Sequence, residues 1–345
     1  MSILNPIETL PKRKRSESNQ RLRAALLSPS GQVLSLLLVL VLLFIFFATS
    51  TSIFLTTNNL INIMRQVSFT GIAAVGATMV LLIAGIDLSL GSVLSLTGVI
   101  AAYFMITLKQ DPYLSVFVAL GLATMVGVVN GLIVTRFKIN PLISTLATLT
   151  IVRGISYTIT NGLPIFGLPT TPFLGFQEGV QAIGKGYIAG IPVPVILMVI
   201  SFVIGYIFLY RTYIGRQIYA IGGNEEAARL SGIKVNQIKL LVYAISAFLA
   251  GVAGLIVLAR VGSGQPSVGQ GFELDVITAV VLGGVSISGG KGNLLGVLLG
   301  VLIMGVLSNG LLLLNVSEWN QMVIRGLVLL VAVGLDQLRI NVGRR

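Results

Sequence analysis

The sequence contains no cysteine and no histidine, and these two absences exclude much of the side-chain chemistry that enzymes use. Without them there is no Ser-His-Asp or Cys-His nucleophile, no thiol redox centre and no zinc site of the usual kind. Charged residues are also scarce, at 10% of 345 residues, whereas hydrophobic residues make up 55%. A soluble chain of this length could not bury so much apolar surface. We therefore expect a membrane protein with no catalytic, cofactor or metal site of its own.

Long apolar segments recur from residue 31 to residue 338, and a helical bilayer crossing needs about 20 such residues. Ten segments can be drawn, at residues 33–48, 66–86, 88–108, 113–135, 141–161, 191–210, 239–260, 273–289, 293–315 and 320–338. The fold class is predicted to be all-α, a transmembrane domain of about ten helices over residues 31–338. Few polar residues separate the segments around Asp87 and around Lys291, so either pair is a hairpin or a broken, re-entrant helix.

The formal net charge of +12 would suit nucleic acid or the anionic lipid of a bilayer, and the membrane character favours the bilayer. If the N-terminus is cytoplasmic and ten crossings alternate, 17 Lys and Arg residues face the cytoplasm and four face the outside. Positive residues concentrate on the cytoplasmic side of membrane proteins. We therefore predict that both termini are cytoplasmic, in a bacterial inner membrane, and we do not expect nucleic acid as a partner.

Four stretches are expected to lie outside the membrane. Residues 1–30 are predicted to form a disordered basic arm, and residues 339–345 a cytoplasmic tail. Residues 211–238 form the largest cytoplasmic loop. Residues 162–190, with three prolines and seven glycines, cannot be one regular helix and are expected to form a loop at the outer face.

Two short motifs occur twice, five crossings apart. Asn130-Gly-Leu and Asn309-Gly-Leu lie in the fourth and ninth segments, and Arg153-Gly and Arg325-Gly lie in the fifth and tenth. An odd offset inverts the second half relative to the first, which is a common construction in transporters. The sequence thus predicts two inverted-topology halves. Gly127/Gly131 and Gly296/Gly300 also have the spacing that lets helices pack closely.

Polar residues within the apolar segments are candidates for a pathway or a gate, because each is costly in a bilayer unless it is paired or wetted. For Asp87 the alternative is an ordinary helix cap, with Ser89 helping. For the arginines the alternatives are snorkelling to a membrane face and an ion pair with an acidic residue. The candidates are Asp87, Ser89, Asn130, Arg153, Glu273, Asp275, Asn309 and Arg325.

Two features bear on how transport would be driven. Residues 289–292 read Gly-Gly-Lys-Gly, which lacks the Ser or Thr and the leading glycine of a phosphate-binding loop, so an ATP-driven system would need a separate ATPase that holds ATP and Mg²⁺. In the 211–238 loop, Asn224 is a good N-cap and Gly232 a good left-handed stop for a helix of about two turns. So short a helix needs a packing partner, either the membrane surface or another protein.

The stretches 84–92 and 215–233, together with the run from Gln265 through Glu273-Leu274-Asp275 to Gly292, resemble the permease subunits of bacterial ribose-type sugar ABC importers. The resemblance covers residues 33 to 338 and leaves out the basic arm. It implies a permease that pairs with a second or homologous copy, an extracytoplasmic sugar-binding protein and a cytoplasmic ATPase, and that imports a monosaccharide, with ribose as the best single expectation.

The same resemblance implies that the 211–238 loop docks into the ATPase, although the Leu-Pro pair of the older coupling signature is missing. Its expected coupling residues are Arg216, Gly223, Asn224, Glu225, Glu226, Ala227, Ala228 and Gly232. On the outer face, Arg65, Lys109 and Lys185 are expected to meet acidic residues of the binding protein. The alternative is an ion-coupled secondary transporter that works alone. A membrane-embedded enzyme is a third class, but no catalytic cluster can be assembled for it.

Overall fold

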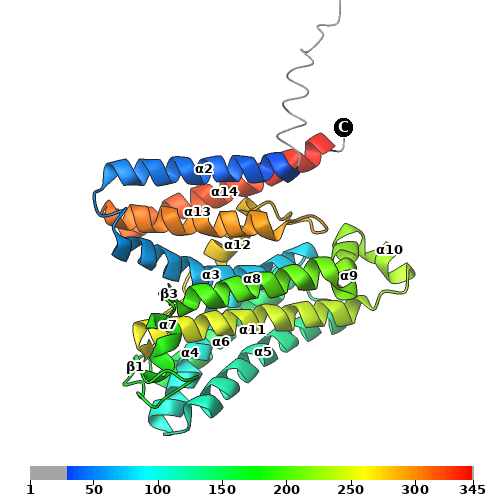
Figure 1. The fold of residues 1–345 in the computed structure, drawn as a ribbon. Coiled ribbons are helices and arrows are strands. Elements are labelled where there is room, and N and C mark those ends of the chain that lie inside the picture. The colour runs from blue at the N-terminus through cyan, green and yellow to red at the C-terminus, as the bar shows by residue number, and fades with distance from the viewer. Residues whose placement is uncertain (1–28, 344–345) are drawn as a thin grey trace, which may run out of the picture.

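The structure, a computed structural model, describes residues 29–343, and the chain folds almost entirely into helices (Figure 1). The elements in chain order are α2 (Pro29–Ser50), α3 (Thr57–Leu82), α4 (Leu90–Ala102), the π-helix η1 (Tyr103–Thr107), α5 (Pro112–Arg136), α6 (Pro141–Thr160), β1 (Ile165–Phe166), the 3₁₀ turn η2 (Gly179–Gln181), α7 (Ala182–Lys185), β2 (Tyr187–Ile188), β3 (Ile191–Pro192), α8 (Val193–Arg211), α9 (Tyr213–Gly223), α10 (Glu225–Leu230), α11 (Val235–Val261), β4 (Ser263–Gly264), α12 (Phe272–Leu282), α13 (Leu294–Leu313) and α14 (Glu318–Gly343). Within residues 29–343 the short strands lie in two connections, one between α6 and α8 and one between α11 and α12, at one end of the bundle.

Eight helices of the described chain are long and apolar enough to cross a membrane. They are α2, α3, α4 extended by η1, α5, α6, α8, α11 and α13, and each coincides with a segment predicted from the sequence. The all-helical membrane fold is therefore confirmed, and eight of the ten predicted segments are helices of crossing length.

Of the remaining two segments, 273–289 differs from the prediction, and 320–338 is helical as predicted. Segment 273–289 holds only the 11-residue helix α12, about 16 Å long, which is half of a hydrocarbon core of about 30 Å. The Gly283-Gly284 pair ends it, and Gly284 has a φ of 90°. Segment 320–338 lies in α14, which continues to Gly343, so the first five residues of the predicted tail are helical. The predicted arm lies outside the described residues except for positions 29 and 30, which begin α2.

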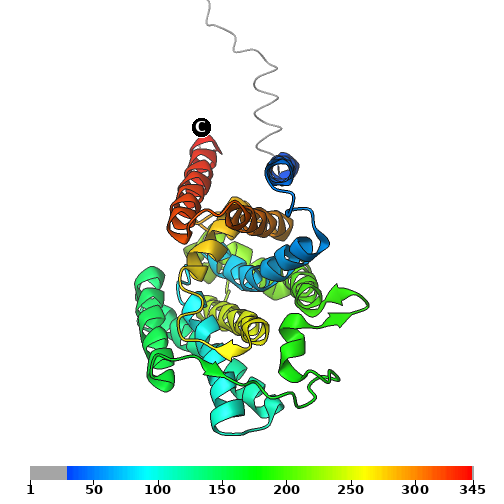
Figure 2. The same ribbon diagram turned by 90° about the vertical axis from the view of Figure 1, so that its left-hand side faces the viewer.

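The helices form two groups with α12 between them (Figure 1). One group contains α2, α13 and α14, and the other contains α3 to α6, α8 and α11. Helix α11 is central, since it packs against α3, α4 and α5. Figure 2 shows α6 and α14 on the same side of the molecule when the bundle is seen end-on.

Small residues bring the central helices close together. A Cβ atom at Gly76 of α3 would lie 2.7 Å from the Cα of Ser246, and one at Gly131 of α5 would lie 2.8 Å from the Cα of Leu240. Neither distance is compatible with a side chain, so only glycine permits these contacts with α11. The Gly127/Gly131 pair noted in the sequence lies at the α5–α11 interface, as its spacing suggested.

The two ends of the bundle are built differently. One end, which we call the α10 end, carries α9 and α10 (Figure 1). The opposite end, the α7 end, carries α7 and the strands. Here β1 pairs with β4 in antiparallel register, Ile165 opposite Gly264, and β2 pairs with β3. Residues 162–190 contain β1, η2, α7 and β2 and do not form one regular helix.

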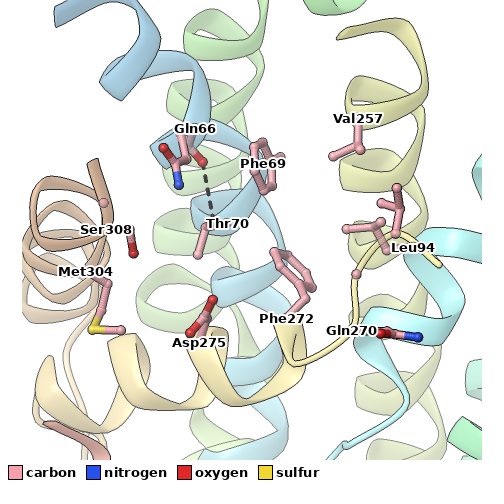
Figure 3. Close-up of a pocket in the computed structure, with 13 residues that line it drawn as sticks. Gln66, Phe69, Thr70, Leu94, Val257, Gln270, Phe272, Asp275, Met304 and Ser308 are labelled. Carbon is pink, nitrogen blue, oxygen red and sulfur yellow. Dashed lines mark hydrogen bonds between the residues drawn. The ribbon is translucent and has the colours of Figure 1, made fainter. Parts of the chain in front are cut away.

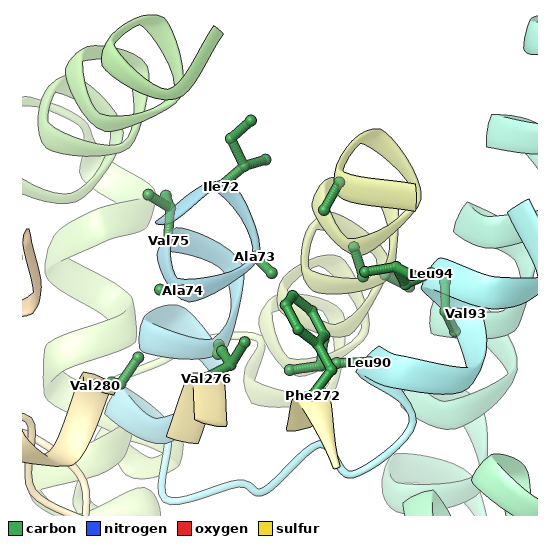
Figure 4. Close-up of a cluster of buried hydrophobic side chains, with 14 of the residues drawn as sticks. Ile72, Ala73, Ala74, Val75, Leu90, Val93, Leu94, Phe272, Val276 and Val280 are labelled. Atoms are coloured by element: carbon green, nitrogen blue, oxygen red, sulfur yellow. The ribbon is translucent and has the colours of Figure 1, made fainter. Parts of the chain in front are cut away.

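Two non-helical stretches run into the interior and meet there. Residues 83–89 lead from α3 into α4, and residues 265–271 lead from β4 into α12. Leu90 and Leu94 of α4 lie beside Phe272 of α12 and the buried residues of α3 (Figure 4). The first turns of α4 and α12 therefore lie next to each other inside the protein.

Candidate functional site

A pocket of about 240 Å³ lies where α3, α4, α11, α12 and α13 converge (Figure 3). The rings of Phe69 and Phe272 stand side by side with centroids 6.0 Å apart. The other lining residues mix apolar and hydrogen-bonding groups: Gln66, Thr70, Leu94, Val257, Val268, Gly269, Gln270, Asp275, Met304, Gly305 and Ser308. Hydroxyl, amide and carboxylate groups beside aromatic rings suit a small hydroxylated ligand, whose polar edges and C–H faces can both be matched.

A larger hollow of about 470 Å³ between α4, α5 and α6 has a different character. Its lining is apolar except for Thr148, and the Thr148 hydroxyl is already committed, donating to Oδ1 of Asn130 over 2.6 Å. This hollow offers no free polar group to a hydroxylated ligand. The pocket at α12 is therefore the better candidate site.

Asp275 joins the pocket to α14. Nη1 of Arg325 donates to Oδ2 of Asp275 over 2.9 Å, and both side chains are less than one-third exposed. Nη2 of Arg325 also donates to Gln321 one turn earlier on the same helix. Of the alternatives left open by the sequence, the ion pair holds for Arg325.

Arg153 is partnered differently. Its Nη1 donates to the carbonyl oxygens of Pro266 and Val268, in the non-helical stretch that leads into α12. Glu273 follows in the first turn of α12 with 9% of its surface exposed, and its Oε2 has no hydrogen-bond partner within the described chain. Arg153 thus fixes the backbone of the stretch that contributes Val268 to the pocket.

Asp87 is buried and bound on several sides. Its Oδ1 accepts from the amide and the hydroxyl of Ser89, and its Oδ2 accepts from the hydroxyl of Ser246 on α11 over 3.1 Å. Asp87 therefore fixes the non-helical stretch before α4 to α11. These contacts favour a structural role for Asp87 near the start of α4. Asp87 does not line the pocket.

The two repeated asparagines each join neighbouring elements. Nδ2 of Asn130 on α5 donates to the hydroxyl of Ser89 over 3.0 Å. Asn309 on α13 exchanges two hydrogen bonds with Asn59 on α3, at 2.9 and 3.0 Å. Neither asparagine lines the pocket, but Asn309 joins α3 to α13, which are two of its walls.

The first turn of α4 touches the backbone of the non-helical stretch that leads into α12. A Cβ atom at Gly91 would collide with the carbonyl oxygen of Gly269 and with Oε2 of Glu273. Gly269 has a φ of 77°, in the left-handed region that favours glycine. The contact is next to the pocket, since Gly269 is one of its lining residues.

At the α10 end, the predicted short helix is present. The Oδ1 of Asn224 accepts from the amide of Ala227 over 3.0 Å, and Gly232 has a φ of 83°, so the predicted cap and stop are confirmed. The sequence interpretation missed α9, the 11-residue helix that precedes α10 and contains Arg216 and Gly223.

Glu225 ties α10 to α11. Its carboxylate accepts from Lys239 of α11 over 2.6 Å and from Arg229 over 3.1 Å. Partial burial alone would raise the pKa of Glu225, but the hydrogen bonds and charges of Lys239 and Arg229 outweigh it and lower the pKa below the usual value. Glu226 and Ala227 are exposed, as is Leu230 at 84%, whereas Ala228 is buried. Helix α10 therefore exposes a partly apolar surface and is attached to α11 through Glu225.

At the α7 end, Arg65 and Lys185 lie together. Nη2 of Arg65 donates to the carbonyl oxygen of Lys185 over 2.7 Å, and its guanidinium lies 4.9 Å from the ring centroid of Tyr187. Lys109 lies between η1 and α5, and nearby Tyr113 accepts a hydrogen bond from the amide of Leu174. The three predicted basic residues therefore share this end.

Sequence reasoning missed most of the pocket lining. Gln66 and Thr70 are polar residues one turn apart in α3, and that spacing could have indicated a polar face. Phe69, Gln270 and Phe272 gave no such signal, because they meet only through the fold.

The family model described as "Branched-chain amino acid transport system / permease component" matches residues 59–333. The ribose import permease protein RbsC of Bacillus subtilis is 46% identical over 284 residues, which cover 82% of this chain and 86% of that protein. RbsC of Haemophilus influenzae is 49% identical over 283 residues, with 82% and 86% covered. The L-arabinose transport system permease protein AraH of Escherichia coli is 39% identical over 286 residues, with 83% and 84% covered. No solved structure matches the chain.

Proposed function

The chain belongs to this family of permease components, and from that premise we propose that it forms the membrane pathway of an ATP-driven importer for ribose. The pocket at α12 carries the proposal, because it places hydrogen-bonding groups beside two phenyl rings inside a membrane bundle. Identity is higher to the ribose permeases, at 46% and 49%, than to the arabinose permease, at 39%, which favours ribose.

We propose that the α10 end faces the cytoplasm of a bacterial cell and that both termini lie on that side. The positive-inside charge distribution supports this orientation. Because the chain has no cysteine, a cysteine introduced at Glu226 is the only target for a thiol reagent. Labelling of this variant by an impermeant reagent in intact cells would show that residue 226 faces outward and would contradict the proposed orientation.

The cytoplasmic partner is an ATPase that docks on α10 and supplies ATP and Mg²⁺. The exposed Glu226, Ala227 and Leu230 form the contact surface, and the cap at Asn224 with the Glu225 ion pairs holds it in place. The extracytoplasmic partner is a sugar-binding protein that docks at the α7 end, where Arg65, Lys109 and Lys185 supply positive charge. Charge reversal at all three should weaken docking at low salt.

A second or homologous copy is expected to pack against the side that carries α6 and α14 (Figure 2). Large apolar side chains are exposed there, including Ile151 and Ile155 on α6 and Val323 and Leu327 on α14. Two inverted halves are supported by the paired arrangement in which a non-helical stretch leads into α4 and another into α12.

The test is reconstitution of the chain with its ATPase and binding protein in lipid vesicles. Ribose uptake should require ATP and the binding protein, and should exceed uptake of arabinose and allose. Replacing Gln66 or Gln270 by alanine should lower ribose uptake while ATPase association persists. Uptake by the chain alone, driven by a proton or sodium gradient without ATP, would contradict the proposal in favour of an ion-coupled carrier.

A further inference from the structure

Three backbone segments meet at Gly222, near the end of α9. The amide of Gly290 donates to the carbonyl oxygen of Leu82, the last residue of α3. A Cβ atom at Gly222 would collide with both of these atoms, the carbonyl oxygen of Leu82 and the amide nitrogen of Gly290. Glycine inside a helix costs about 1 kcal/mol relative to alanine, so this close approach is a physical reason for a glycine here.

The segment that contains Gly290 is held from two further sides. The hydroxyl of Tyr219, one turn before Gly222 on α9, donates to the carbonyl oxygen of Gly292 over 3.1 Å. On the other side, the Ser286 hydroxyl and the Ile287 amide donate to Oδ2 of Asp336 on α14. Residues 283–293 are therefore a bonded connector between α9 and α14 rather than a loose loop.

The segments that meet at Gly222 continue into the pocket. Helix α3 carries Gln66 and Thr70, and α12, which ends immediately before the connector, carries Phe272 and Asp275. On the other side, α9 is joined directly to α10: the amide of Asn224 donates to the carbonyl oxygen of Ala220, and Asn224 caps α10. One junction thus lies between the helix pair α9–α10 and two walls of the pocket.

We propose that Gly222 is a positioning residue for transport, through which a displacement of α9 and α10 by the ATPase moves the ends of α3 and α12 together and opens the pocket. This inference rests on the proposed import function. Backbone atoms in van der Waals contact transmit a push without slack, because no side-chain rotamer can absorb it. The hydrogen bond from Tyr219 transmits the opposite pull.

The neighbouring glycine provides a matched control. A Cβ atom at Gly223 would have no heavy atom within 4 Å, whereas one at Gly222 would meet backbone. Gly222→Ala should leave copurification of the ATPase unchanged, since the docking surface of α10 is untouched. The ratio of ribose imported to ATP hydrolysed should fall by about tenfold, which corresponds to a loss of roughly 1.4 kcal/mol in the free energy that couples ATP hydrolysis to transport. Gly223→Ala should keep the wild-type ratio.

A milder variant covers the case in which Gly222→Ala does not fold. Tyr219→Phe removes one hydrogen bond and adds no atoms, so the protein should stay folded in detergent while the ratio falls by about fivefold. If the folded Gly222→Ala or Tyr219→Phe protein keeps the wild-type ratio, the inference is wrong. A wild-type complex that shows no ATP-dependent uptake would instead contradict the import function, so the two failures are distinguishable.

Discussion

Arg325 of α14 and Asp275 of α12 form an ion pair of 2.9 Å across the wall of the pocket. This ion pair links the short helix α12 to the long helix α14. Breaking a buried pair by removing one partner costs about 3 kcal/mol, because the other charge is left uncompensated. Removing both charged groups leaves no uncompensated charge.

We therefore expect Arg325→Gln and Asp275→Asn each to lower the thermal stability of the purified protein and to reduce uptake. The double variant should recover much of the stability, with a coupling free energy of about 2 kcal/mol in a double-mutant cycle. Thermal unfolding in detergent measures the cycle. If the double variant lost as much stability as the two single variants together, the two side chains would not interact.

The cap of α10 can be tested by Asn224→Ala. Loss of the hydrogen bond from the amide of Ala227 should cost about 1 kcal/mol of local helix stability, a roughly fivefold loss of amide protection. Hydrogen exchange of residues 225–230 measures it. Asn224→Asp keeps an acceptor oxygen and should retain protection. Equal protection in all three proteins would mean that the cap does not hold α10.

The attachment of α10 to α11 should depend on acid pH. The pKa of Glu225 lies below its usual value of 4.5 in the folded chain, so its ion pairs stabilise the attachment at pH values above 4.5. That stabilisation is lost as pH falls from 4.5 through the lowered pKa, when the carboxylate takes up a proton.

A spin label on a cysteine at Glu226 should become more mobile in that pH range. With Glu225→Gln in the same protein, the mobility should be high at every pH, because the glutamine cannot form the ion pair with Lys239. A pH response that persists in the Glu225→Gln background would assign the transition to another group.

The backbone contact between Gly91 of α4 and Gly269, before α12, should not tolerate a side chain. Gly91→Ala would press a methyl group against Gly269 and Glu273, and overpacking of this kind costs about 1 to 3 kcal/mol. We expect lower thermal stability and strongly reduced uptake. Gly121→Ala on α5 is the control, because no heavy atom lies within 4 Å of the added carbon. Normal uptake by the Gly91→Ala variant would contradict this prediction, because it would show that the added methyl group is accommodated at the contact.

The sequence was most informative where one apolar segment makes one helix, as in α2 or α13. It was misleading over 273–289, where apolar residues continue beyond the end of α12 and composition does not mark the turn at Gly283 and Gly284. The local cap at Asn224 was predictable, because its partner is three residues away.

The pocket was predictable only in part. Asp275 stood out as a carboxylate in an apolar region, but its partner Arg325 lies 50 residues further along the chain. Arg153 was open to several interpretations because its acceptors are backbone carbonyls, which every residue has. Helix α9 was missed because three glycines in 11 residues are unfavourable for a helix, and one of them, Gly222, is present for space rather than for conformation.

The contact of Gly91 with Gly269 also bears on the ion permeability of the membrane. A bacterial membrane stores energy as a voltage and a proton gradient, and moving one charge through 100 mV is worth about 2.3 kcal/mol. Two backbones in contact leave no room for a hydrated ion between them. We therefore expect this contact to keep hydrated sodium ions out of the space between α4 and the stretch before α12 without a charged plug, and any variant that holds these glycines apart to appear as a steady sodium leak current.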